Sequence, residues 1–458
     1  MVKDFRSISS QKLDWQIITP NEKADWINQR DGIFDNLIPL FDNTIGQGFF
    51  NYIPIGVLSS RDSWVCNFDK NTLLSNINRM INNYNTSISH RKAEDFNYNP
   101  TQIGWSANLK KVALTGHLLN FIPESVTIYT YRLFQKSYLY YERSLIERPG
   151  QWQHIFPPNC YNQVIGMKGT GGNKDFSLFL YNTIIDYNNF EAGTKCFPLY
   201  WYEENKNREG TLFDDAETNR YIRRDGITDW ILKEVRSRFG GSRAITKEHI
   251  FYYVYGLLHS KQYRERFADD LKKSLPRIPI VDNVQDFMAF YKAGKELADL
   301  HLNIPATEQG AVAYSEMSAQ AQRTLGVIVT GDIDIWQDEW TEETYQYFAV
   351  EKMRFAKVRD ENGKLIADKT HIIYNSHITI ENIPLKAYEY IVNGKSAIEW
   401  IMERYAVTID KASQIKNNPN DWSKEREQPR YILDLLLSVI ILSCKTVDVT
   451  STFPFCKW

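Results

Sequence analysis

The segment from Ile245 to Ile280 constrains the fold most strongly, because its pattern predicts two consecutive helices. Thr246 is placed as the N-cap of the first helix, and Ser260 opens the second, which runs from Gln262 to Lys273 before two prolines end it. The apolar residues of the first helix follow a helical spacing: Ile250, Phe251, Val254, Leu257 and Leu258. The chain must therefore bury a helical hairpin, but this pattern alone predicts no chemistry.

Strand patterns dominate before this hairpin, and a β-hairpin followed by helices is predicted after it. The predicted strands are Phe49–Val57, Trp64–Phe68, Val126–Tyr131, Tyr138–Tyr141, Gln163–Met167, Asp175–Leu180 and Lys195–Tyr202. The predicted helical regions are Thr72–Tyr84, Arg208–Ile280, Val284–Asp299, Leu385–Ile391, Ser396–Arg404 and Pro429–Cys444. Val350–Ile380 carries the clearest β pattern, with Asn362-Gly363 as the turn between two strands. The predicted fold is α+β, with a β-rich core, a helical hairpin insertion and a C-terminal hairpin-plus-helices subdomain.

The charge is unevenly distributed along the chain, although the net charge of −2 excludes a uniformly basic surface. Trp105–Leu180 carries 8 Lys and Arg against 4 Asp and Glu, and Arg208–Arg277 carries 15 against 11, so each stretch has an excess of four positive charges. From His301 to the end the count is 17 against 22. Two basic stretches of this size are compatible with a surface that faces phosphates, but charge excesses of this size also arise by chance in other folds.

The cysteines and the apolar runs predict a cytoplasmic protein with no membrane partner. The five cysteines lie far apart without a CxxC pair, which predicts neither a disulfide framework nor a zinc ribbon. The polar start, MVKDFRSISSQKLDW, does not resemble a signal peptide. The longest apolar run, Tyr431–Cys444, contains Asp434 and is shorter than the roughly 20 residues of a membrane span.

Several blocks, in a fixed order, resemble one known family. They are SSRDSW at Ser59–Trp64, WSANLKK at Trp105–Lys111, YRLFQK at Tyr131–Lys136, CFPLYWY at Cys196–Tyr202, and MRFAKVRDENGKL with NSHITIENIPLKAYEY from Met353 onward. Together with the helical hairpin they resemble the C-terminal specificity region of the fused restriction–modification enzymes called type ISP, and of related adenine-N6 DNA methyltransferases. Ser60 stands where that region has Gly, and Leu133 where it has Pro.

The resemblance implies that this chain recognises double-stranded DNA. The residues it implies as DNA contacts are Arg61, Lys110, Lys111, Arg132 and Lys136, and the Gly-rich piece GMKGTGGNK adds Lys168 and Lys174 as possible backbone-phosphate contacts. A scaffold or ion-pair role remains open for each of them. Removing any one of the first five of these cationic side chains is expected to weaken DNA binding and leave the fold intact, because cations in turns are usually solvated. Trp64 and Trp105 are expected in the core.

The resemblance also implies a division of the chain. Residues 1–40 would end, or lead from, a methyltransferase-like catalytic domain. Residues 41–205 would form a β-rich target-recognition subdomain, 206–300 a helical subdomain, and 301–458 an α+β specificity subdomain. The partner would be a methyltransferase or helicase–nuclease portion, encoded upstream or on a separate chain.

The motifs of adenine methylation are missing from this sequence. S-adenosylmethionine requires a Gly-rich turn, and the extruded base requires an Asn/Asp-Pro-Pro-aromatic loop. The one Pro-Pro pair, Pro157-Pro158, has its Asn on the wrong side, and GMKGTGGNK fits neither a phosphate-loop nor a dinucleotide pattern. No cofactor is therefore expected in this chain, and S-adenosylmethionine is implied only for the absent catalytic domain.

Two other functions remain open. One is a self-contained magnesium nuclease, in which Asp186, Glu204 and Lys206 would bind the metal and activate water. The spacing of these residues is permissive, and such matches arise often by chance. Asp332 and Asp334 are better explained as a solvated strand edge than as a magnesium site. The other function is a non-catalytic interaction remnant of a split gene.

Overall fold

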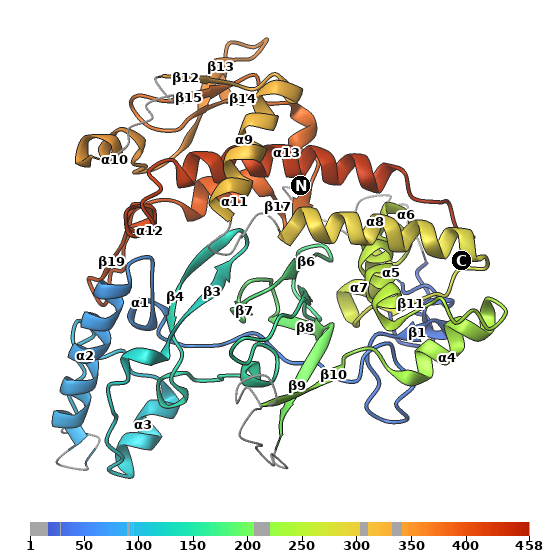
Figure 1. The fold of residues 1–458 in the computed structure, drawn as a ribbon, viewed down its shortest axis with the longest axis horizontal. Coiled ribbons are helices and arrows are strands. Elements are labelled where there is room, and N and C mark those ends of the chain that lie inside the picture. The colour runs from blue at the N-terminus through green and yellow to red at the C-terminus, as the bar shows by residue number, and fades with distance from the viewer. Residues whose placement is uncertain are drawn as a thin grey trace, which may run out of the picture.

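The computed structural model describes residues 17–457, apart from 28, 89–91, 93, 95, 206–219, 303–309 and 332–340. It has the predicted α+β class: several small sheets with helices packed around them (Figure 1). The helices are α1 (Asp62–Val65), α2 (Lys70–Ser87), α3 (Ala107–Leu114), α4 (Asp229–Arg238), α5 (Lys247–His259), α6 (Lys261–Arg266), α7 (Ala268–Lys273), α8 (Val284–Leu302), α9 (Gly310–Leu325), α10 (Glu342–Phe348), α11 (Ala397–Arg404), α12 (Pro419–Glu425) and α13 (Tyr431–Ser451).

The strands are short and belong to seven sheets in the described part of the chain. They are β1 (Ile38–Pro39), β2 (Cys66–Asn67), β3 (Val126–Arg132), β4 (Gln135–Tyr140), β5 (Val164–Lys168), β6 (Leu178–Tyr181), β7 (Ile184–Ile185), β8 (Thr194–Pro198), β9 (Tyr200–Glu204), β10 (Tyr221–Asp225), β11 (Arg277–Ile278), β12 (Ile328–Thr330), β13 (Arg354–Arg359), β14 (Leu365–Ile373), β15 (Thr379–Glu381), β16 (Ile391–Val392), β17 (Lys395–Ser396), β18 (Thr408–Ile409) and β19 (Lys416–Asn417). The larger sheets have the orders β2-β4-β3-β7, β6-β5-β8 and β12-β15-β14-β13.

Two hydrophobic cores share one sheet. The first core surrounds the β3–β4 hairpin, α2, α11 and α13, and the second surrounds α4, α5 and α8. The sheet β6-β5-β8 lies between them, because successive side chains of a strand point to opposite faces. Val164 and Phe179 face the first core, whereas Ile165 and Leu180 face the second. This sheet is therefore buried on both faces and joins the two halves of the molecule.

The predicted helical hairpin is present, with one difference. Thr246 caps α5 and forms a capping box with His249, and Ser260 caps the next helix. That second helix is split into α6 and α7 at Phe267, where the backbone leaves the helical region. The helix α5 is buried on all sides from residue 250 to 259, since α8 covers the face that its three tyrosines would otherwise expose.

Glycines allow α5 and α8 to cross closely. A Cβ on Gly256 would lie 2.3 Å from the carbonyl oxygen of Phe290, and one on Gly294 would lie 1.9 Å from that of Tyr252. The tyrosines of α5 find hydrogen-bond partners inside the protein. Tyr252 donates to Gln163 (2.9 Å) and Tyr253 to the carbonyl of Pro279 (2.7 Å).

The C-terminal prediction is confirmed in its main elements. The strands β13 and β14 form the expected hairpin, closed by the five-residue loop 360–364, in which Gly363 has a φ of +74°. The carboxylate of Asp360 accepts the backbone N–H groups of Asn362 (3.0 Å) and Lys364 (2.8 Å), so the turn is longer than the tight Asn-Gly turn that the sequence predicts. The helices α11 and α13 also form where expected, and Leu385–Tyr388 is a short 3-10 helix.

Some strand and helix predictions were wrong. Phe49–Val57 makes only isolated β-bridges, because Pro54 interrupts it and Gly56 packs directly on the backbone of Asp186. In the stretch Trp64–Phe68, the first two residues end α1 and the next two form the short strand β2. The region predicted as helical from Arg208 contains the strands β10 and β11. The strand β10 pairs with the preceding strand β9, whereas β11 pairs with β1, which lies far away in the sequence. The pair Asp332 and Asp334 lies outside the described residues.

Candidate nucleic-acid interface

Three of the sequence blocks meet in space. The block at Ser59–Trp64 forms the turn before α1 and α1 itself, WSANLKK forms the start of α3, and YRLFQK forms the tip of the β3–β4 hairpin. Arg61 contacts Ser106 of the second block, and Asp62 contacts Tyr131 and Arg132 of the third. The polar residues of these blocks therefore form one connected network.

Arg61 is buried in this network, with 6% of its surface exposed. Its Nη1 donates to the carbonyl of Leu145 at 2.9 Å, and its Nη2 donates to the hydroxyl of Ser106. The same hydroxyl caps α3 by accepting the N–H of Leu109 and donates to Glu147 at 2.5 Å. Burial lowers the pKa of Arg61 to about 10, and the carboxylate of Glu147 opposes this. The expectation of a solvated side chain was wrong here, since Arg61 anchors the start of α3.

Arg132 forms the centre of a half-buried ion triad. Its Nη1 lies 2.6 Å from Asp186 Oδ1, and its Nη2 lies 3.2 Å from Asp62 Oδ2. Tyr131 donates to the same Asp62 oxygen at 2.9 Å, and the guanidinium carbon lies 3.8 Å from the centre of its ring. Burial raises the pKa of Asp186, and Arg132 opposes that rise. Arg132 therefore neutralises a carboxylate that the fold has removed from water, which the sequence did not indicate.

Lys136 is also buried, with 4% of its surface exposed. It lies on β4 opposite Thr130, and no described residue accepts a hydrogen bond from its ammonium or pairs with it. Burial, together with the nearby guanidinium of Arg426, lowers its pKa to about 7. For Lys136, too, the expectation of a solvated cation was wrong.

The Gly-rich piece is closed by a carboxylate. Gly171 and Gly172 have φ angles of +88° and +80°, and Glu191 accepts the backbone N–H of Lys174 at 2.7 Å. The ammonium of Lys168 is buried, donates to the carbonyl of Gly171 and lies 3.9 Å from Glu191. Lys174 is half-buried, 5.5 Å from the ring centre of Trp400. Hydrogen bonds and an ion pair from Lys168 and Glu191 therefore hold the turn in place, and Lys174 lies at its accessible edge.

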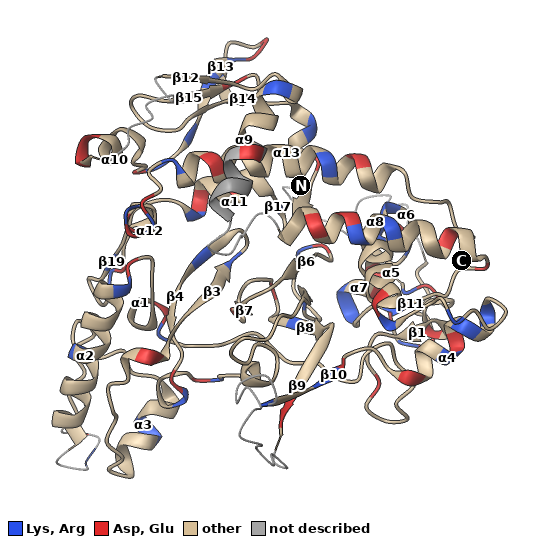
Figure 2. Cartoon of the chain, in the orientation of Figure 1, with Lys and Arg blue, Asp and Glu red and all other residues tan. Residues whose placement is uncertain are grey.

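Lys110 and Lys111 are the exposed members of the predicted set. Both lie on α3, and neither lies within 4.0 Å of a carboxylate of the described residues. The ammonium of Lys110 lies 4.9 Å from the ring centre of Tyr98, which leaves the charge accessible. Figure 2 shows basic and acidic residues interspersed along the other elements. Other exposed lysines, such as Lys292 and Lys352, also have no carboxylate within 4.0 Å among the described residues, so Lys110 and Lys111 are distinguished by lying next to each other on α3. Trp64 is buried as expected, and Trp105 is half-buried and stacks on Phe96.

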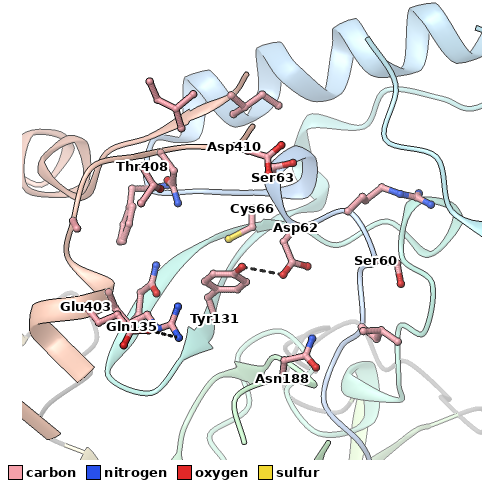
Figure 3. Close-up of a pocket in the computed structure, with 18 residues that line it drawn as sticks. Ser60, Asp62, Ser63, Cys66, Tyr131, Gln135, Asn188, Glu403, Thr408 and Asp410 are labelled. Atoms are coloured by element: carbon pink, nitrogen blue, oxygen red, sulfur yellow. Dashed lines mark hydrogen bonds and ion pairs between the residues drawn. The ribbon is translucent and has the colours of Figure 1, made fainter. Parts of the chain in front are cut away.

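A cavity of about 570 Å³ opens between two of these blocks, at Ser59–Trp64 and Tyr131–Lys136, and the segment from Glu403 to Asn417 (Figure 3). Asp62, Tyr131 and Gln135 line it from the blocks, and Arg404 and Asp410 line it from the other side. Arg61 Nε and Gln135 Oε1 are buried there without a hydrogen-bond partner among the described residues. Hydrogen bonds from Ser413 and Ser63 lower the pKa of Asp410. Sequence reasoning missed Arg404 and Asp410, since nothing in their local pattern places them beside residues more than 250 positions earlier.

The turn before α1 has a Gly-like backbone at Ser60, with a φ of +57°. A non-Gly residue in this conformation destabilises the folded protein by roughly 1–2 kcal/mol. Glycine removes this strain, but it also increases the conformational entropy of the unfolded chain, which offsets part of the gain. We expect Ser60→Gly to raise the free energy of unfolding by roughly 0.5–1 kcal/mol. The matched change Ser63→Gly, inside α1, should lower it by about 1 kcal/mol. Urea denaturation of both variants measures these changes in the free energy of unfolding. A Ser60→Gly variant that is less stable than the wild type would contradict the Gly-like backbone conformation of Ser60.

The candidate nuclease residues are not arranged for metal binding in the described part of the chain. The Asp186 carboxylate is taken by Arg132 and by the backbone N–H of Asn188 (2.7 Å). Glu204 ends β9 at the surface, and Lys206 lies outside the described residues. Among the described residues there is no group of three His, Cys, Asp or Glu side chains that could hold a metal ion, and no helix suited to cross a membrane.

Comparison with known proteins places these features in one family. The family model described as the type ISP C-terminal specificity domain matches residues 48–435. A nuclease-deletion mutant of the type ISP enzyme LlaGI, solved with a DNA substrate mimic, superimposes with a TM-score of 0.75 at 32% identity, covering 97% of this chain and 37% of that one. The ATP-dependent type ISP enzyme LlaBIII bound to DNA gives 0.78 at 32% identity, covering 96% and 26%.

A third solved structure shares the fold. The DrdV–DNA complex superimposes with a TM-score of 0.74 at 23% identity, covering 98% of this chain and 41% of that one. No curated protein matches the chain. The chain thus spans about a quarter to two fifths of the length of these solved relatives.

Proposed function

Because the chain belongs to the type ISP C-terminal specificity domain family, we propose that it recognises specific sequences in double-stranded DNA for a restriction–modification enzyme. The observation that carries this proposal is the match over residues 48–435, together with two relatives at 32% identity that were solved with DNA or a DNA mimic. In this proposal the chain contributes recognition and leaves the chemistry to other parts of the enzyme. Those parts would include an adenine-N6 methyltransferase that uses S-adenosylmethionine, and a helicase–nuclease portion.

The proposal assigns different roles to the basic residues. Lys110 and Lys111 contact backbone phosphates, supported by their exposure and lack of carboxylate partners. Lys174, at the edge of the Gly-rich turn, also contacts a phosphate in this proposal. The proposal also divides the chain into four parts, with boundaries at residues 40, 205 and 300. A cytoplasmic location fits the five cysteines, none of which forms a disulfide.

We expect the double variant Lys110→Ala/Lys111→Ala to bind duplex DNA more weakly without a lower melting temperature. Each phosphate contact releases condensed counterions, so log Kd depends linearly on log salt with a slope of about 0.9 per contact. The double variant should therefore reduce that slope by about 1.8. Fluorescence anisotropy with labelled duplexes between low and physiological salt measures both the affinity and the slope.

The control for this experiment is Lys292→Ala/Lys352→Ala. Both lysines are exposed and lie outside the two basic stretches, so this pair changes net charge equally. It should leave the slope unchanged if the binding surface lies at α3. Equal losses in both double variants would show that only overall charge matters. No binding by the wild type at low salt would refute the recognition proposal itself.

A further inference from the structure

A groove of about 430 Å³ lies between α2, the turn before α3 and the β18–β19 hairpin, residues 408–417. Of the nine residues that line it, eight are polar, one is apolar and none carries a carboxylate. The polar side chains include Thr72, Asn76 and Arg79 on one face of α2, Gln102 in the turn, and Ser413 and Lys416 in the hairpin. The groove is therefore a polar surface without negative side chains.

Hydrogen bonds fasten the hairpin to the start of α2 and so form the groove. The Nδ2 of Asn67, just before α2, donates to the carbonyl of Lys416 at 3.2 Å. The carboxylate of Asp410 accepts the backbone N–H and the hydroxyl of Ser413, each at 2.7 Å, which fixes the turn of the hairpin. Figure 1 shows β19 beside α2. The fold therefore brings together two sides of the groove that are more than 300 positions apart in the sequence.

Two of the lining residues are exposed cations, Arg79 and Lys416. Neither has a carboxylate of the described residues within 4.0 Å. Arg79 Nη2 donates to Oδ1 of Asn76 at 3.0 Å, and its guanidinium carbon lies 5.0 Å from the ring centre of Trp64. Because a guanidinium has five N–H donors, these contacts orient Arg79 and leave further donors for a ligand. The ammonium of Lys416 adds donors from the hairpin side.

The carboxylates near the groove lie outside its lining. Burial and the nearby Asp69 raise the pKa of Asp421, and Lys416 opposes this rise, but neither carboxylate lines the groove. Asp410 lines the cavity of about 570 Å³ instead, which three carboxylates share. Of these two spaces, the groove is therefore the more favourable one for an anion.

We propose that this groove holds a backbone phosphate of the bound duplex. This inference rests on the DNA recognition proposed above and names one place where the chain contacts DNA. Phosphate oxygens in DNA complexes accept hydrogen bonds from Arg and Lys and from Ser, Thr, Asn and Gln, which are the polar side chains of this lining. Arg79 contacts the phosphate from α2 and Lys416 from the hairpin, so the bound strand bridges two segments that are distant in the sequence.

Fluorescence anisotropy of the full chain with a labelled duplex of mixed sequence tests this inference. Lys416→Ala should weaken binding roughly threefold to tenfold, the worth of one hydrogen bond, and lower the salt slope by about 0.9. Thr72→Glu should weaken binding roughly fivefold, because it places a carboxylate beside the phosphate. Both positions are exposed, and a carboxylate in the first turn of α2 favours the helix, so neither variant should have a lower melting temperature.

Each variant has a matched control. Lys411→Ala removes another exposed lysine of the hairpin, and Asn71→Glu adds a carboxylate next to Thr72, but neither position lines the groove. Both controls should bind nearly as the wild type does. Weaker binding by the two groove variants alone supports the inference, whereas unchanged binding by them, or equal losses in the controls, overturns it. Neither result bears on the recognition proposal, which the absence of wild-type binding would refute.

Discussion

Arg132→Met is expected to lower the free energy of unfolding by roughly 3–5 kcal/mol, the cost of removing one partner from a buried ion pair. The variant leaves the Asp186 carboxylate, which is 2% exposed, without the guanidinium 2.6 Å away, and Asp62 then adds a like charge nearby. Chemical denaturation monitored by tryptophan fluorescence measures the change. This expectation replaces the sequence-based one, in which Arg132 could be removed at little cost.

Two variants make this test specific. Arg143→Met removes an exposed arginine in the same region and should change stability by less than about 0.5 kcal/mol. Arg132→Met combined with Asp186→Asn removes the orphaned charge and should recover part of the loss. If Arg132→Met were as stable as the wild type but bound DNA weakly, the arginine would be a DNA contact and the triad would not matter for folding.

Lys136→Met is expected to raise the free energy of unfolding at pH 7 by roughly 2–4 kcal/mol. Burial lowers the pKa of Lys136 in the folded protein to about 7, against 10.5 for an unperturbed lysine. Between these values the unfolded chain binds more protons, so the stability of the wild type rises as the pH rises from about 7 to about 10.5. Methionine has a similar length and no charge, so it removes this penalty.

The gain should therefore shrink as the pH approaches 10.5. Urea denaturation of both proteins at several pH values from 7 upward measures it. Lys110→Met, an exposed position on another element, should show no such pH dependence. A destabilised Lys136→Met variant, or one with weaker DNA binding, would mean that the ammonium has a partner that compensates its burial.

Local patterns predicted those features that neighbouring residues fix. Thr246 and Ser260 cap helices because a hydroxyl beside free N–H groups forms these hydrogen bonds in any context. The hairpin β13–β14 forms because alternating residues flank a turn, and the order of the blocks identified the family. Trp64 was expected in the core and is there.

The sequence by itself determined the α+β class, the helical hairpin and the family, because capping, periodicity and block order are local or collinear properties. Only the tertiary structure decided which cations are free. Arg61, Arg132 and Lys136 resemble Lys110 and Lys111 in a sequence, yet the first three are largely buried and the last two are exposed. The physical reason is that burial and ion pairing depend on residues brought from elsewhere in the chain, such as Asp186 against Arg132 and Arg426 against Lys136.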